Sequence, residues 1–159
     1  MQDFSAILIK IDADRASLLE KRRIDVGDIR KVIAYAQAAG KAFVNKVTGR
    51  YLAYCRPSIT TYWVEYNLKG NEYEILCAYS HRMEILEGFN IPPKSPERSD
   101  DWWCVKCNVP LERATVKLTY LDETFGVDLP SCPSCQRVFV SEENALQKMA
   151  LAEKMLEDK

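Results

Sequence analysis

Residues 102–140 read WWCVKCNVPLERATVKLTYLDETFGVDLPSCPSCQRVFV and contain two CxxC pairs, CVKC at 104–107 and CPSC at 132–135. Two cysteines separated by two residues can turn both sulfur atoms toward one point, and a second pair completes a tetrahedron. These 39 residues are too few for an apolar core alone to sustain a fold. We therefore expect residues 102–141 to fold around one metal ion. Its ligands would be the thiolates of Cys104, Cys107, Cys132 and Cys135.

Zinc is the metal that this ligand set favours, because four thiolates form the closed shell of a structural zinc site. Rubredoxin-like iron is the main alternative, since rubredoxins also use two CxxC knuckles, commonly with a proline such as Pro133 in the second. Their knuckles usually carry glycine after the second cysteine. This chain has Asn108 there, which tolerates positive φ, and Gln136, which is the larger departure. A thioredoxin-like dithiol would need a βαβ context and only one CxxC pair.

The sequence between and after the CxxC pairs predicts a hairpin and a C-terminal helix. Alternating apolar residues at 114–120 and 124–129 indicate two strands. Ser141 can cap a helix with an apolar stripe. The stripe consists of Ala145, Met149, Ala152 and Leu156. This helix can pack back on its own chain, pair with a second copy to form a homodimer, or bind another protein.

Two helices are predicted near the N-terminus. Residues 12–23 begin with acidic and end with basic side chains, an order that complements a helix dipole. A longer helix follows, with Asp25 as its N-cap and Gly40 as a left-handed C-cap. Its apolar face recurs at helical spacing. This face consists of Val26, Ile29, Val32, Ile33 and Ala36.

The next stretch predicts an antiparallel sheet of about four strands, because it is rich in β-branched and aromatic residues and contains glycine loops. The longer helix should cover one face of this sheet. The predicted strands are 42–45, 50–56, 60–68 and 72–83.

Residues 86–101 change composition abruptly and contain three prolines, which predicts an extended, fairly stiff linker. The fold class is therefore α+β, with two modules. We expect an α+β module with antiparallel hairpins at 1–86, a proline-rich linker at 87–101, and a zinc ribbon with the C-terminal helix at 102–159.

Charge and apolar patterning argue against two classes of partner. The 22 basic and 23 acidic residues nearly cancel and are dispersed, so we expect no nucleic-acid binding. No stretch approaches the ~20 apolar residues of a membrane span, and residues 1–10 lack the pattern of a secretory signal. We expect a soluble, cytoplasmic protein, in which paired cysteines indicate metal or redox chemistry rather than disulfides.

Three other features have both a functional and a structural interpretation. Cys55 and Cys77 could form a redox pair, but two buried apolar side chains are favoured. Residues 79–84 with Arg56 could bind an anion, but capping of the sheet edge is favoured. The strand aromatics could stack on bases, although cross-strand packing is favoured without interleaved basic residues. The WW pair at 102–103 is expected to shield the metal site.

Several segments resemble a family of small zinc-ribbon proteins of anaerobic bacteria that are labelled redox proteins. The C-terminal motifs are WCVKCNVPLE, LPSCPSCQRVFV and KMLEDK. The N-terminal motifs TGRYLAYCRP, TYWVEY and AYSHRMEI are similar to its longer members. In that family the genes lie beside those of molybdenum-containing aldehyde oxidoreductases. The resemblance implies a supporting role near an enzyme.

The sequence favours a binding module over an enzyme, because a closed metal site has no open coordination position. The first hypothesis is a metal-binding accessory or adaptor protein that docks an oxidoreductase or its assembly factors. The second is single-electron transfer by iron. Catalysis by the N-terminal module through His81 or Arg82 is a weaker third hypothesis, and no catalytic residue is assigned.

Overall fold

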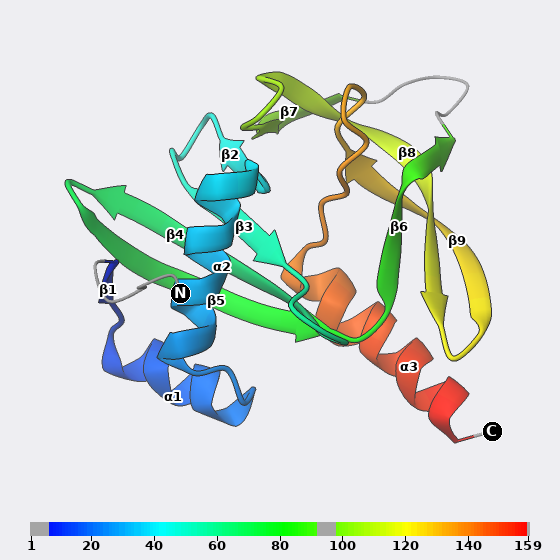
Figure 1. Cartoon of the computed structure of the whole chain (residues 1–159), viewed down its shortest axis with the longest axis horizontal. Helices are drawn as coiled ribbons and strands as arrows, with labels where there is room; N and C mark the ends of the chain where they lie inside the picture. The colour runs from blue at the N-terminus through cyan, green and yellow to red at the C-terminus, as the bar shows by residue number, and fades with distance from the viewer. Residues whose placement is uncertain (1–6, 92–97, 159) are drawn as a thin grey trace.

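The computed structural model describes residues 7–91 and 98–158. In this part, nine strands form one sheet in the order β1-β5-β4-β3-β2-β7-β8-β6, and β9 pairs with β8 (Figure 1). The strands are β1 (Leu8–Lys10), β2 (Ala42–Asn45), β3 (Tyr51–Cys55), β4 (Thr61–Lys69), β5 (Glu72–His81), β6 (Glu84–Ile91), β7 (Arg98–Cys104), β8 (Val109–Tyr120) and β9 (Glu123–Ser131). The helices are α1 (Ala13–Lys21), α2 (Val26–Ala39) and α3 (Ala150–Glu157), and α3 continues a π-helical segment, Asn144–Met149. The α+β class is confirmed.

Local capping positions both N-terminal helices as the sequence predicted. The carboxylate of Asp12 accepts a hydrogen bond from the backbone N–H of Arg15 at 2.8 Å. Asp25 and Asp28 form a reciprocal capping box at the start of α2. Gly40 ends α2 with φ 68°, and a Cβ at this position would lie 3.3 Å from Cβ of Lys106. Glycine thus serves the left-handed turn and the close approach of the first CxxC segment.

The four predicted N-terminal strands are confirmed as an antiparallel β2-β3-β4-β5 arrangement. A fifth strand, β1, was not predicted. It runs parallel to β5, with Leu8 opposite Glu72. Three residues are too short to show a period, so β1 is fixed by its pairing and not by its own sequence.

The segment predicted as a linker contains strand at both of its described ends. Residues 86–91 belong to β6, which pairs with β8, and residues 98–101 belong to β7. Strand β7 pairs with β2 on one side and with β8 on the other, so the sheet continues from the N-terminal hairpins into the ribbon. The prolines at 92, 93 and 96 lie outside the described residues. The module boundaries at 86 and 102 stay a prediction.

Two apolar clusters lie on opposite faces of the N-terminal strands. The first, here called the helix-side core, joins α1 and α2 to the sheet and draws only on residues 7–78 among those described. Its largest fully buried side chains are Ile29, Ile33, Ile75, Val32 and Val64.

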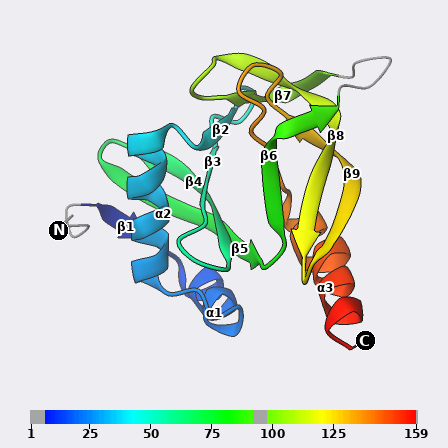
Figure 2. The same ribbon diagram turned by 45° about the vertical axis from the view of Figure 1, so that its right-hand side comes forward.

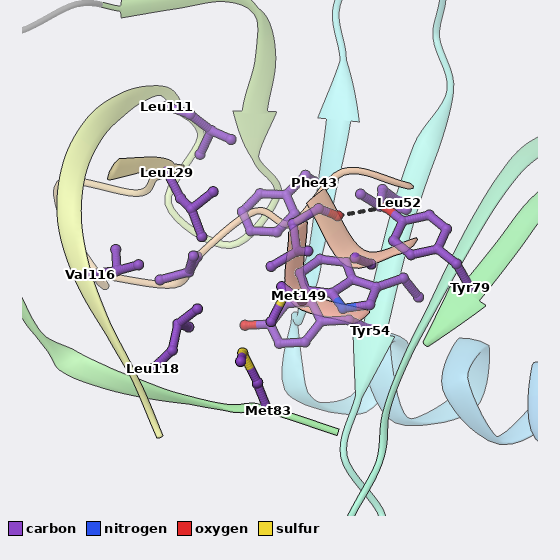
Figure 3. Packing of buried hydrophobic residues seen from close by; sticks show 14 of the residues in the cluster. Phe43, Leu52, Tyr54, Tyr79, Met83, Leu111, Val116, Leu118, Leu129 and Met149 are labelled. Carbon is purple, nitrogen blue, oxygen red and sulfur yellow. Dashed lines mark hydrogen bonds between the residues drawn. The ribbon is translucent and has the colours of Figure 1, made fainter. Parts of the chain in front are cut away.

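The second cluster, here called the aromatic core, joins the N-terminal strands to β8, β9 and the C-terminal helix (Figure 3). Rings of Phe43, Tyr54, Trp63 and Tyr79 stack across neighbouring strands, with Tyr54 and Trp63 centroids 4.5 Å apart. Aliphatic residues of the ribbon pack on this stack. They include Leu111, Val116, Leu118 and Leu129. The N-terminal sheet and the C-terminal third of the chain therefore share one buried core.

The predicted ribbon hairpin and C-terminal helix are both present. Strands β8 and β9 pair from Glu112 opposite Ser131 to Tyr120 opposite Glu123. Ser141 Oγ accepts a hydrogen bond from the backbone N–H of Asn144 at 3.2 Å, which confirms the cap. The predicted stripe packs on the aromatic core, so the helix lies back on its own chain, beside β8 and β9 (Figure 2). Within the described part, no helix is both long and apolar enough to span a membrane.

Candidate metal centre

The four cysteines of the two CxxC pairs converge on one point. Their sulfur atoms all lie within 4.8 Å of one another. Cys104 ends β7 and Cys132 follows β9, and both are fully buried. Cys107 and Cys135 are partly exposed. Each pair thus contributes one inner and one outer sulfur.

The two knuckles have the same backbone geometry. In the first, the N–H of Asn108 donates to the carbonyl of Cys104 at 2.8 Å. In the second, the N–H of Gln136 donates to the carbonyl of Cys132 at 2.9 Å. Asn108 and Gln136 both have positive φ, 54° and 63°. Gln136 therefore adopts the conformation that glycine usually provides, and its departure from the rubredoxin pattern does not count against iron.

One sulfur–sulfur distance equals the edge expected around a tetrahedral metal ion. Zinc–sulfur bonds of about 2.3 Å, arranged tetrahedrally, place neighbouring sulfur atoms about 3.8 Å apart. The sulfur atoms of Cys104 and Cys135 are 3.8 Å apart. A backbone N–H of Cys135 also points at the sulfur of Cys132 at 3.4 Å, which stabilises negative charge on that atom. Zinc and iron can both use this donor set, so it does not identify the metal.

Electrostatics at the site depend on whether a cation is present. Without one, burial raises the pKa of the Cys104 thiol and that of the Cys135 thiol. Burial also acts to raise the pKa of Cys107, but a hydrogen bond with Ser134 and others with the neighbouring cysteines outweigh it, and the net pKa is lowered. A divalent cation at the centre would compensate the buried thiolates.

Residues next to the second knuckle connect it to distant parts of the chain. The guanidinium of Arg137, 9% exposed, donates to the carbonyls of Ala39 and Gly40 at the end of α2. Asn90 of β6 donates from its backbone to Oε1 of Gln136 and from its side chain to the Gln136 carbonyl. The ring of Phe139 packs on Phe43, with centroids 5.5 Å apart. The knuckle is therefore tied to α2, to β6 and to the aromatic core.

Sequence reasoning did not identify Asn90 or Arg137 as supports of the site. Asn90 lies 46 residues before Gln136, inside the segment predicted as a linker. The available signal in the sequence was Gln136 itself, which stands where such knuckles usually have glycine. A non-glycine residue held at positive φ there needs neighbours that stabilise it. For the WW pair, Trp102 packs on Phe139 at 5.0 Å and Lys46 lies over the ring of Trp103. Direct shielding of the sulfur atoms by these rings stays a prediction.

Cys55 and Cys77 do not face one another. Cys55 belongs to the helix-side core, whereas Cys77 borders the aromatic core on the other face. Cys55 is the buried apolar side chain that was favoured. Cys77 differs, because it is partly exposed and its thiol donates to Glu142 at 2.5 Å. Burial and this carboxylate raise the pKa of Cys77 to about 12, so it stays a thiol at neutral pH.

The polar groups at the end of β5 are used in internal contacts. Arg56 donates to the carbonyls of Arg82 and Met83 and to the hydroxyl of Thr61. His81 accepts from the indole N–H of Trp63 at 2.9 Å, so its other ring nitrogen carries the proton and donates to Met83. The buried carboxylate of Glu153 accepts from the backbone N–H groups of Arg82 and Met83. These contacts support the capping interpretation, and the stacked aromatics support cross-strand packing.

Among known protein families, a match was found that covers the two CxxC pairs and the C-terminal helix. Residues 100–159 match the model of a family described as a domain of unknown function (DUF7479). No curated protein and no solved structure matches the chain. The match contains all four clustered cysteines and the C-terminal helix, and together these findings fit a zinc-ribbon-like site.

Proposed function

We propose that Cys104, Cys107, Cys132 and Cys135 bind one zinc ion with a structural role. The supporting observation is the convergence of two matching knuckles, with a sulfur–sulfur separation equal to a tetrahedral edge. Four cysteines fill all four positions of a zinc shell, which leaves none for a substrate. The ion would therefore order the ribbon rather than perform catalysis.

The position of the site indicates a second structural role for the ion. Cys104 lies opposite Phe43 of β2 in the sheet, and Val105 donates a backbone hydrogen bond to Ala42. Arg137 reaches the end of α2 from the other knuckle. An ion that fixes both knuckles would fix both of these contacts. Metal binding would thus attach the ribbon to the N-terminal sheet.

Metal content tests this proposal. Protein purified from its source cell should contain about one zinc per chain by elemental analysis and should show no visible absorption. Cys132→Ser should lose the metal. Cys55→Ser is the matched control, because Cys55 is also buried but lies in the other core, and it should keep one zinc. Equal metal content in both variants, or none in the native protein, would refute the site.

Iron is the second candidate, because the positive φ of both Asn108 and Gln136 gives the two knuckles a turn that is compatible with a rubredoxin-type site. An iron site would make the chain a single-electron carrier. The native protein would then be red, with thiolate-to-iron charge-transfer bands that disappear on reduction. Recombinant expression can load the wrong metal, so protein from the source cell decides between the two metals.

We further propose that the chain is an accessory or adaptor protein of the cytoplasm that docks an oxidoreductase or its assembly factors. Three observations support this: the resemblance described above, a metal shell with no open position, and the internal use of the polar groups around His81. Free thiols also suit a reducing compartment. Tagged protein should retain a molybdenum-containing oxidoreductase activity from extract of the source cell. Activity retained equally by Cys132→Ser or by an empty resin would contradict the adaptor role.

A further inference from the structure

An exposed stripe runs along the outer face of the C-terminal helix. It consists of Lys148, Leu151, Met155 and Asp158, spaced at i, i+3, i+7 and i+10, which places them on one side of a helix. Leu151 is 61% exposed and Met155 is 63% exposed, although the opposite side of the same helix is buried in the aromatic core. These two large apolar side chains are neighbours on an ordered helix, so they form one exposed apolar patch.

The charges at the two ends of the stripe have opposite sign. Lys148 lies at its start and Asp158 at its end, and neither forms an ion pair with any residue in the described part of the chain. The two acidic groups within α3 are engaged, since Glu153 and Glu157 both pair with Arg82. The stripe therefore presents one cation and one anion at its two ends, separated by two apolar residues, and the exposed Lys154 lies beside it.

This arrangement is complementary to itself when two helices run antiparallel. A two-fold axis through position 153 places Lys148 opposite the partner's Asp158 and Leu151 opposite the partner's Met155. Every contact then occurs twice, as in an isologous interface. A parallel pair would instead oppose lysine to lysine and aspartate to aspartate, which is unfavourable. The pattern thus selects one orientation.

A shallow apolar cleft borders the stripe and enlarges this surface. It has a volume of about 250 Å³ and lies between the helix and the β8–β9 hairpin. Its walls include Phe125 and Val127 from β9 and Ala152 from the helix, while Lys148 lines both the cleft and the stripe. The small side chain of Ala152 permits close approach, and a flexible methionine such as the partner's Met155 suits an irregular apolar cleft.

We propose that a second copy of this chain docks on this stripe, with the two C-terminal helices antiparallel. Charge complementarity and the shared cleft support this occupant. About three helical turns and one cleft form a smaller surface than the ~800 Å² per partner of a standard interface, so the dimer is weak and forms at micromolar to millimolar concentration. The proposal goes beyond metal binding and is independent of which metal the knuckles hold.

Sedimentation velocity of the metal-loaded full chain over a wide concentration range tests the dimer. The native chain should shift toward the dimer as its concentration rises. Lys148→Asp and Asp158→Lys should each weaken association by about tenfold or more, because each places like charges opposite one another twice. The double variant Lys148→Asp with Asp158→Lys restores opposite charges in the same orientation, so its affinity should return to within about threefold of the native value.

Apolar substitutions give an independent readout. Leu151→Glu should abolish the dimer, while Ile59→Glu is the matched control, because Ile59 is also exposed, at 73%, but lies between β3 and β4. All these positions are on the surface, so circular dichroism and metal content should not change. A native chain that stays monomeric throughout, a dimer indifferent to Leu151→Glu, or a double variant no better than the single variants would overturn the proposal.

Discussion

The two cores of this molecule depend on the chain in different ways. The helix-side core draws only on residues 7–78 among those described, and its caps, hairpins and apolar faces are all formed within that stretch. The aromatic core draws on the strands from Phe43 onward and on the C-terminal third of the chain, and it contains Cys104 and Cys132 among its fully buried members. One face of the N-terminal sheet is thus covered by local elements, whereas the other face is covered by the proposed metal-dependent ribbon.

This difference shows where the metal matters energetically. The ribbon is short and its buried aliphatic residues pack on the N-terminal rings, so it lacks a separate core of its own (Figure 3). Losing the ribbon would expose Phe43 and Trp63, which are both fully buried. The ion would therefore protect a large apolar surface outside the ribbon as well as the ribbon fold.

Metal removal has the largest expected effect. Zinc binding to a site of this type contributes on the order of 10 kcal/mol, comparable to the whole stability of a domain. A chelator strong enough to remove zinc should therefore unfold β8 and β9. Amide hydrogen exchange should become fast in these strands, while α2 keeps part of its protection through the helix-side core. Simultaneous loss of protection in α2 and β8 would contradict the distinction between the two cores, because they would then unfold as one cooperative unit.

The second largest effect is expected from acid, which should destabilise the aromatic core by protonating His81. Burial lowers the pKa of this histidine to about 4, from an ordinary value of 6.5. An unfolded chain binds this proton already below pH 6.5, so the free energy of unfolding should decrease as pH falls from 6.5 to 4. The total loss is about 3 kcal/mol at about 1.4 kcal/mol per pH unit.

The protonation of His81 can be measured directly, because it is the chain's one histidine. Its imidazole proton signal should titrate in NMR with a midpoint near the lowered pKa of about 4. Denaturation curves of His81→Gln should lack this pH-dependent component, and the difference from the native chain removes any metal release common to both. A midpoint near the ordinary histidine value would show that His81 is not buried as described.

Local signals predicted much of the fold and of the site. Asp25 and Gly40 could be identified as caps from residue type, and the four cysteines from spacing. The strands that were missed are those defined by distant partners. Strand β6 contains Gly88 and exposes Phe89, so it lacks alternation and exists because it pairs with β8. Strand β7 likewise depends on β2 and β8.

Side-chain contacts across the chain were equally inaccessible to sequence patterns. Glu153 looks like an ordinary surface residue of a helix, yet it is 4% exposed and caps two backbone N–H groups at the β5–β6 corner. Cys77 was predicted as an apolar side chain, but Glu142, 65 residues away, gives it a polar partner. Such pairs depend on tertiary geometry, which residue type alone does not determine.

Arg137 allows the link between the ribbon and α2 to be broken without touching the cysteines. Arg137→Met keeps the length of the side chain but removes the donors to the Ala39 and Gly40 carbonyls. We expect a loss of about 2 kcal/mol, because two partly buried carbonyls lose a charged partner. Exchange should increase in the last turn of α2. Arg50→Met is the matched control, since the Arg50 side chain is 48% exposed in its ion pair and should change stability by less than about 0.5 kcal/mol.

The smallest expected effect compares two hairpin turns. The β4–β5 turn already has glycine at positive φ, Gly70 at 63°, whereas the β8–β9 turn places Leu121 at 49° and Asp122 at 67°. A leucine in this region costs about 1–2 kcal/mol, and two successive positive φ values are those of a type I′ turn that Asn-Gly prefers. Leu121→Asn with Asp122→Gly should therefore stabilise the chain by about 1 kcal/mol. Because Leu121 is 56% exposed, no buried contact is lost. Hydrogen exchange should slow in β8 and β9 and stay unchanged in α2, so a gain confined to α2 would contradict the separation of the two cores.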